Sequence, residues 1–322
     1  MTSVIVRHFG GVMEGISAML TVMLSNAERD IFEPVTLEQL IGDGQVLPSL
    51  PAAFKRVSEQ LDDRSCSLAQ IGNTIQNDPA ITSRILKLVN SSYYGLPGQI
   101  TSVTLAVNLL GRARCKHVLI GSVLGSVFEA GENPAFSIQA FWQHSIKTAL
   151  IARQLADYTD GIEEPEAMFT AGLLHDIGKL MLIERFPQQM LAAEETMIRR
   201  RIDELSAELS QVGLTHTAVG AALMQHWGLP DILVECARFH NETVHDGPNR
   251  RATHLVYLAN RLSEYVPPLD DSETLAILDD IPNWDMGQVS IEQIAAACQV
   301  ADDLVFEVME SLGMVPAEID DA

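Results

Sequence analysis

AGLLHDIGK, residues 171–179, is the stretch of this sequence that decides its interpretation, because an apolar helix runs here directly into adjacent histidine and aspartate side chains. His175 and Asp176 can bind one divalent ion together, since an imidazole offers nitrogen and a carboxylate offers oxygen and negative charge. Lys179 follows one helical turn later, where its mobile cation can meet a phosphate group. The alternative is that the pair only caps a helix end, so the other histidines decide between a metal site and a cap.

His144 lies on the helix that precedes this stretch. The apolar periodicity predicts one helix over residues 137–158 and the next from Pro165 onward. The acidic, glycine-containing loop of residues 157–166 between them is short, which predicts that the two helices are antiparallel neighbours. His144 can therefore reach the His-Asp pair.

His216 and His240 lie near the ends of two later predicted helices. Together with His144, His175 and Asp176 they can converge on one cavity, as the ligands of metal sites in helical bundles do. The alternative is that some of them are ordinary, partly buried histidines bonded to backbone carbonyl groups. We prefer that alternative for four further histidines: His117, His226, His245 and His254.

Helical periodicity dominates the chain and no alternating strand pattern stands out, which predicts an all-α fold. Ser67 is expected to cap one helix, and Asp78-Pro79 supplies the N-cap and the first-position proline of the next. Gly111 is expected to be a hinge in the helix that Ser102 opens. Further helices are predicted over residues 215–227, 231–240, 252–265, 291–298 and 302–312.

Two segments have a pronounced polar or apolar face. Residues 12–24 form one apolar stripe, which predicts a helix that either packs on the main domain, the interpretation we prefer, or makes a homodimer. Residues 188–211 are polar and charged on one side, and this side includes Glu204 and Glu208. Such a charged face is usually solvated.

Prolines mark the domain boundaries. LPSLP, residues 47–51, forces an extended entry before a new helical run, and Pro267-Pro268 mark the end of the main domain. The predicted division is an N-terminal helical extension, residues 1–45, a main domain, residues 46–265, and an acidic C-terminal helical extension, residues 266–322.

The charge of the chain restricts the classes of partner that it can bind, and its cysteine content indicates the cellular compartment. The 43 acidic residues outnumber the 21 basic residues, and the formal net charge is −22. Such a surface repels nucleic acid and anionic membranes, although a local basic pocket could bind a small nucleotide. The four cysteines form no CxxC pair, which fits a reducing compartment. The apolar run of residues 12–24 is too short to span a bilayer and lacks a cleavage site, so we expect a cytoplasmic protein.

Several motifs, in order along the chain, resemble the HDOD domain family. The first half of the resemblance rests on Leu47-Pro48-Ser49-Leu50-Pro51, Asp78-Pro79, Leu86 through Asn90-Ser91, Ile100-Thr101-Ser102 and Ala106-Val107 to Leu110-Gly111. The second half rests on Phe141-Trp142-Gln143-His144, residues 171–179, His216 with Gly220, and Trp227-Gly228-Leu229-Pro230. The resemblance covers about residues 47–265. It implies a multi-helix bundle with an N-terminal helical half, similar to the HD and HD-GYP phosphohydrolases, and a bacterial regulatory output module.

The resemblance also assigns the metal-binding positions. His144 matches the first histidine of the HD pattern, His175 and Asp176 match its signature pair, and Lys179 matches the lysine that contacts phosphate. If the site is catalytic, the resemblance makes Lys179 and His240 the candidate catalytic residues.

Two asparagines depart from the family pattern. His216 and His240 match the additional histidines of two-metal HD-GYP sites, but Asn241 stands where a second adjacent histidine is expected, and Asn260 stands at the closing aspartate. Asparagine offers only a neutral oxygen, so we expect no firmly held cofactor and at most a weakly bound divalent ion such as Fe, Mn, Zn or Mg.

Three functional hypotheses follow. The leading one is a non-catalytic signal-transduction module that binds a signalling protein, and potentially a small nucleotide, between its two helical halves. The rival is a metal-dependent phosphohydrolase that uses His144, His175 and Asp176, with Asn260 or water completing the site. In the third, the histidines bind nothing, and the acidic tail and the N-terminal helix act only in assembly.

Overall fold

The computed structural model describes residues 48–96, 98–124, 127–128, 136–264, 278 and 289–314. The predicted helix over residues 12–24 and the prolines at 267 and 268 lie outside these residues. Within the described ranges all regular structure is helical and no strand is present, which confirms the predicted all-α fold.

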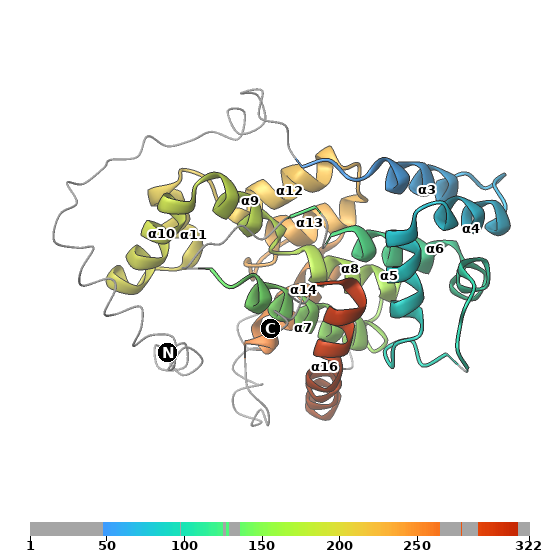
Figure 1. The fold of residues 1–322 in the computed structure, drawn as a ribbon. Coiled ribbons are helices and arrows are strands. Elements are labelled where there is room, and N and C mark those ends of the chain that lie inside the picture. Colours follow the sequence, from blue (N-terminus) through green and yellow to red (C-terminus); the bar gives the residue numbers. More distant parts are fainter. Residues whose placement is uncertain are drawn as a thin grey trace, which may run out of the picture.

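Figure 1 shows the order of the helices along the chain. In chain order they are α3 (Ala52–Asp62), α4 (Leu68–Gln76), α5 (Pro79–Val89), α6 (Val103–Leu124), α7 (Ile138–Ala156), α8 (Pro165–Leu174), α9 (Ile177–Arg185), α10 (Pro187–Arg200), α11 (Glu204–Gln211), α12 (His216–His226), α13 (Asp231–Phe239), α14 (Arg250–Ser263) and α16 (Ile291–Leu312).

The predicted caps begin two helices of the N-terminal half, α4 and α5. The Ser67 side chain accepts a hydrogen bond from the backbone N–H of Gln70, and the Gln70 side chain accepts one from the backbone N–H of Ser67. This capping box begins α4 where the sequence predicts it. Asp78 accepts from the N–H of Ile81 at 3.0 Å, and Pro79 occupies the first position of α5.

A kink divides α6 at Gly111, as the sequence predicts. Gly111 has φ 72° and ψ 178°, a backbone conformation that is nearly exclusive to glycine. The next residue, Arg112, donates to the carbonyl oxygens of Gln60 and Leu61 at 3.0 and 3.1 Å, so the segment after the kink holds the end of α3. The kink therefore positions two helices of the N-terminal half relative to each other.

We expect Gly111→Ala to lower the free energy of unfolding by about 1–3 kcal/mol, because alanine is strained at this φ and ψ although no atom would meet its Cβ. Gly121→Ala is the matched control in the same helix. Its Cβ would meet Leu312 and Leu173 at ordinary contact distances of 3.4 and 3.6 Å, so we expect it to be neutral or to stabilise by roughly 0.5–1 kcal/mol. Chemical denaturation of both variants measures the difference, and equal effects would contradict a strained backbone at the kink.

Helix α7 is the centre of the C-terminal half and packs against α8, α14 and α16. The close approach of α8 to α7 depends on Gly172, since a Cβ there would lie 2.6 Å from the Cα of Ala149. One cluster of buried apolar side chains runs from Leu50 to Met314 and joins both halves. Trp227 also donates its indole N–H to the carbonyl oxygen of Pro48 at 2.6 Å.

The C-terminal segment differs from its prediction. Two helices were predicted over residues 291–298 and 302–312, but α16 is one continuous helix that begins at a Ser290 capping box and ends at Gly313. Ala301, in the expected gap, is fully buried, and no breaker residue is present there. Helix α16 packs on α7 and α5, and its buried apolar side chains belong to the common core.

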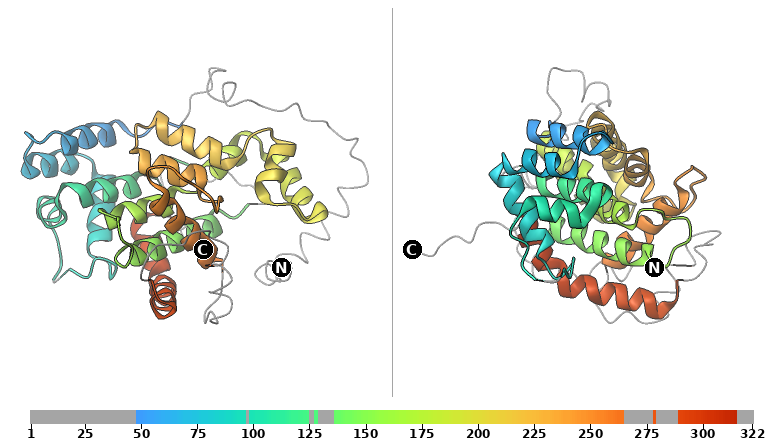
Figure 2. Two further views of the ribbon diagram at one scale, coloured as in Figure 1. Left: turned by 180° about the vertical axis from the view of Figure 1, so that it is seen from behind. Right: turned by 90° about the vertical axis from the view of Figure 1, so that its right-hand side faces the viewer.

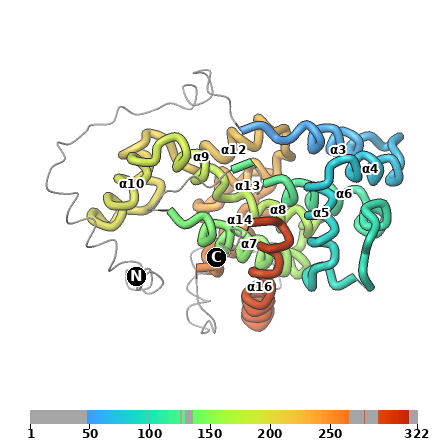
Figure 3. The backbone as a smooth tube through the Cα atoms, viewed as in Figure 1, coloured from blue at the N-terminus to red at the C-terminus, as the bar shows by residue number. Residues whose placement is uncertain are grey.

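Helices α3 and α4 lie at one end of the molecule, and α10 and α11 lie at the other end. Both the front view and the back view show this arrangement (Figures 1 and 2). The tube drawing shows α7, α8 and α14 between these ends (Figure 3). Among the described helices, none combines the length and the apolar character needed to cross a membrane.

Candidate metal centre

The stretch of residues 171–179 forms a sharp turn between two helices. Helix α8 is buried along almost its whole length and ends at His175, and Asp176, with φ −99° and ψ 7°, lies between α8 and α9. Both side chains are buried, with exposed fractions of 0% and 2%. The turn therefore presents an imidazole and a carboxylate to the interior of the bundle.

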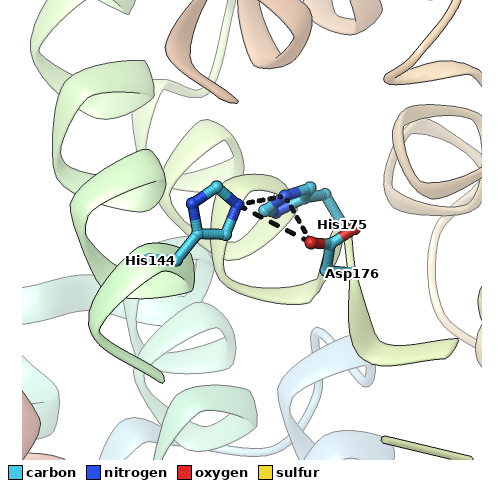
Figure 4. A group of neighbouring side chains, drawn as sticks. All are labelled: His144, His175 and Asp176. Carbon is cyan, nitrogen blue, oxygen red and sulfur yellow. Dashed lines mark hydrogen bonds and ion pairs between the residues drawn. The ribbon is translucent and has the colours of Figure 1, made fainter. Parts of the chain in front are cut away.

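Four histidine side chains converge on the carboxylate of Asp176, as the sequence predicts. The Oδ2 atom lies 3.6 Å from His144 Nε2 and 3.4 Å from His175 Nε2 (Figure 4). The Oδ1 atom lies 3.3 Å from His216 Nε2 and 3.2 Å from His240 Nε2. We call the first group, His144, His175 and Asp176 Oδ2, the outer subsite. The second group, His216, His240 and Asp176 Oδ1, is the inner subsite.

The opposite ring nitrogen of each histidine meets a fixed partner. His175 Nδ1 lies 2.6 Å from the carbonyl oxygen of Gly172, and His240 Nδ1 lies 2.9 Å from that of Ala237. A carbonyl oxygen can only accept, so both Nδ1 atoms carry a proton. Burial lowers the pKa of His240 to about 4, so its ring is neutral at pH 7 and its Nε2 carries a lone pair.

His144 and His216 are held in the same way by side chains. The Ser263 hydroxyl donates to the carbonyl oxygen of Asn260 at 2.7 Å, so it can accept from His144 Nδ1 at 3.1 Å. His216 Nδ1 lies 2.8 Å from a carboxylate oxygen of Glu208. Burial is also the largest influence on the pKa of His144, which is lowered to about 3.

These residues fit a divalent ion. Asp176 Oδ1 is buried without a hydrogen-bond partner, and the unprotonated Nε2 of His240 faces it at 3.2 Å. Lone pairs and a carboxylate directed at one another repel unless a cation lies between them. Partners that fix the tautomer of a histidine and aim its other nitrogen inward are typical of metal ligands. A site with imidazoles and one carboxylate suits Zn, Fe or Mn.

The ammonium group of Lys179 forms ion pairs with two carboxylates. Its ammonium nitrogen lies 2.9 Å from Asp176 Oδ2 and 2.9 Å from Glu204 Oε1. Burial lowers the pKa of Lys179, but the attraction of Asp176 and Glu204 outweighs this and raises it, so the ammonium stays charged. The predicted contact of Lys179 with a phosphate stays a prediction, and it would require one of these ion pairs to open.

The two asparagines lie differently relative to the cluster. Asn241 Nδ2 lies 3.2 Å from His216 Nε2 and 3.1 Å from His240 Nε2, so its amide belongs to the inner subsite. Asn260 is buried on α14, and the hydrogen bond that links its turn to the cluster comes from Ser263. Its predicted role as a ligand stays a prediction.

Sequence reasoning missed Glu208 and Ser263. The charged face of residues 188–211, which the sequence predicts to be solvated, includes Glu208, but Glu208 is 1% exposed, so the prediction is wrong at this residue. Its partner His216 lies eight residues further along, beyond a turn at Gly213, and no short motif links them. The contact of Ser263 with His144 is equally hard to predict from a motif, because the two residues are 119 positions apart in the sequence.

The histidines that we interpreted as ordinary ones lie elsewhere. His117 Nδ1 contacts the Thr170 hydroxyl at 2.9 Å, and His245 stacks on Phe239. His254 is buried on α14, and His226 is exposed. None of the metal-ligand groups found among the described residues includes them.

The pKa shifts predict that the metal-free protein loses stability on acidification. The folded pKa values of His144 and His240, about 3 and about 4, lie below the unfolded value of 6.5. Unfolding therefore takes up protons, and stability falls as the pH drops from 6.5 to about 4. His216 opposes this. Burial and Lys179 lower its pKa, but Glu208 and Glu204 outweigh them, so its contribution is present below pH 6.5 and is lost at higher pH.

Urea denaturation in chelator at pH 7 and pH 4.5 measures this effect. We expect a net loss on the order of 2 kcal/mol, and a smaller loss in a His240→Gln variant, which cannot take up the proton. Equal stability at both pH values would contradict the neutral state assigned to these rings.

Comparisons with known proteins identify the family of this chain. A family model described as the HDOD domain matches residues 47–243. An uncharacterised protein of Treponema pallidum (strain Nichols) is 26% identical over 201 residues, which are 62% of this chain and 38% of that protein. The chain thus spans less than two fifths of the length of this curated relative.

Solved structures share the fold. A protein of Shewanella amazonensis SB2B, whose name proposes a phosphohydrolase without establishing one, has a TM-score of 0.69 at 21% identity, over 87% of this chain and 97% of that one. An HDOD domain protein with unknown function from Geobacter sulfurreducens has a TM-score of 0.62 at 20% identity, over 95% and 100%. A Marinobacter aquaeolei VT8 protein, named provisionally for signal transduction, has a TM-score of 0.64 at 21% identity, over 94% and 66%.

Proposed function

Since the chain belongs to the HDOD domain family, we propose that it is a signal-transduction module that binds a partner protein and does not hydrolyse phosphoesters. The observation that carries the proposal is the burial of four of the five residues that would hold the metal ion. His175, His216 and His240 have no exposed surface and Asp176 is 2% exposed. Catalytic metal sites keep a coordination position open to substrate, whereas structural sites are closed.

The state of Lys179 supports the same function. A phosphohydrolase needs a cation that meets the substrate phosphate, but the ammonium of Lys179 is already shared between Asp176 and Glu204. Divalent metal bound among these five ligands would supply positive charge between α7, the α8–α9 turn, α12 and the end of α13. In a module without turnover, such a centre stabilises one arrangement of the helices.

A groove apart from this centre supports the binding of a protein. A cavity of about 580 Å³ opens between α5, the loop that follows it and α16. Its charged lining consists of Lys87, Glu307 and Glu310, and the remaining lining is mostly polar. Two carboxylates beside one ammonium repel an anionic nucleotide, so this groove favours a polar protein segment.

A turnover assay tests the proposal. The full chain, loaded with Mn²⁺, Zn²⁺ or Fe²⁺, is incubated with cyclic dinucleotides and with a generic phosphomonoester. We expect no hydrolysis above that of a His175→Ala variant prepared in the same way. Hydrolysis by the unaltered chain that disappears in His175→Ala would overturn the proposal.

One observation favours the rival function of a metal-dependent phosphohydrolase. The side chains of His144, His175 and Asp176 lie close enough together to hold one ion, and the side chain of His144 is 26% exposed. Among the five ligands, His144 in the outer subsite is therefore the one that a substrate could approach most easily. The same assay decides between the two functions, because only the rival predicts turnover.

A further inference from the structure

The two subsites have different supporting residues. In the inner subsite, Glu208 approaches His216 Nδ1 with both carboxylate oxygens, at 2.8 and 2.9 Å, and also accepts from the backbone N–H of His216 at 2.8 Å. Glu208 is 1% exposed, so this carboxylate is buried against the imidazole. In the outer subsite, the corresponding partner of His144 is the neutral hydroxyl of Ser263.

This difference changes how strongly each of the two subsites binds a metal ion. A carboxylate behind a metal-binding imidazole fixes its tautomer and makes the ring nitrogen a stronger donor. A buried negative charge also stabilises a nearby cation, because screening by water is weak there. Ser263 fixes the orientation of His144 without adding charge. Among the described residues, no carboxylate lies behind either imidazole of the outer subsite, so Glu208 strengthens the inner subsite alone.

The competitors for the two carboxylate oxygens differ as well. Asp176 Oδ2, in the outer subsite, already binds the Lys179 ammonium at 2.9 Å, and a metal ion there would lie beside this cation. Asp176 Oδ1, in the inner subsite, has no hydrogen-bond partner. The neighbour there is the neutral amide of Asn241, which can present its oxygen instead of its nitrogen by rotating about its last bond.

We propose that Glu208 is a positioning residue that makes the inner subsite load first. One divalent ion per chain is then held by Asp176, His216 and His240 more tightly than the two asparagines lead us to expect from the sequence, and a second ion binds only weakly at His144 and His175. The inference rests on the metal-binding centre of the proposed function and adds the order and the strength of loading. It also assigns opposite effects to Glu208, which favours metal binding, and to Lys179, which opposes it.

Titration of the chelator-treated full chain with Co²⁺, followed by visible absorption and calorimetry, tests the order of loading. We expect two steps, a first with one ion per chain and a second at least about tenfold weaker. Glu208→Gln is expected to weaken the first step by about 10- to 100-fold, the usual effect of losing such a partner. Glu208→Asp keeps the charge and is expected to recover part of this affinity.

Two control variants act on the outer subsite. Ser263→Ala is expected to weaken the second step and leave the first unchanged, whereas Lys179→Met is expected to strengthen the second step by removing the competing cation. Helix content and unfolding of the metal-free variants are measured alongside. A merely structural role for Glu208 predicts that Glu208→Gln lowers the stability of the metal-free protein without changing its Co²⁺ affinity.

The outcomes separate the two proposals. No Co²⁺ binding, two equal steps, or an equal effect of Glu208→Gln and Ser263→Ala on the first step would each overturn ordered loading, while leaving a module without turnover intact. Phosphoester hydrolysis by the Co²⁺-loaded protein would overturn the proposed function, while ordered loading would stand if the two steps are seen.

Discussion

Asp176→Asn is expected to reduce the affinity for divalent ions at both subsites, and by more than the roughly 10- to 100-fold caused by losing a partner behind a ligand. Asp176 is the one residue that the two subsites share, through Oδ2 and Oδ1. Asparagine preserves the size of the side chain and removes its charge, which leaves four neutral imidazoles to hold a dication. Elemental analysis and Co²⁺ titration measure the loss.

Asp203→Asn is the matched control for this substitution. Asp203 is the exposed N-cap of α11, where it accepts from the N–H of Ser206 at 2.9 Å, and asparagine caps helices about as well as aspartate. This variant should keep its metal affinity. An Asp176→Asn protein that is folded and still binds one ion tightly would show that the ligands are not the ones assigned here.

Gly178→Ala is expected to lower the free energy of unfolding by about 3 kcal/mol or more, or to prevent folding. A Cβ at residue 178 would overlap the carbonyl oxygen of His216 and lie 2.6 Å from the backbone nitrogen of Gly220. Both are backbone atoms, so no side chain can rotate away, and α9 must separate from α12. This separation would also pull His216 away from Asp176.

Gly220→Ala is the graded comparison on the other side of the same helix crossing. Its Cβ would lie 3.2 Å from the nitrogen of Gly178 and 3.5 Å from a methyl group of Ile177, so small shifts can accommodate it. We expect a loss of about 1 kcal/mol. Thermal and chemical unfolding of both variants measure the contrast, and similar stabilities would mean that α9 and α12 can separate at little cost.

The sequence predicted the features that local chemistry dictates. Ser67, Asp78 and Gly111 act within a few residues of themselves, through caps and a special backbone conformation, so the pattern alone identifies them. The convergence of His144 and His175 followed from a short loop between two helices, which restricts how those helices can pack.

The missed features depend on contacts between distant parts of the chain. Glu208 has the same local pattern as the exposed acids around it, and only the packing of α11 near the start of α12 buries it. The pairing of Lys179 with Glu204 likewise joins α9 to α11. A single sequence contains no periodic signal for such pairs, so the charge balance of the centre could not be predicted.

Helices α10 and α11 bury few side chains against the rest of the molecule. Their fully buried residues are Ala193, Thr196, Ala207 and Glu208, whereas α7 buries most of its length. Segments with little buried apolar surface open locally at a lower free energy than the core does. Amide hydrogens of α10 and α11 should therefore exchange with solvent through local opening. Amide hydrogens of α7 should exchange only when the whole domain unfolds.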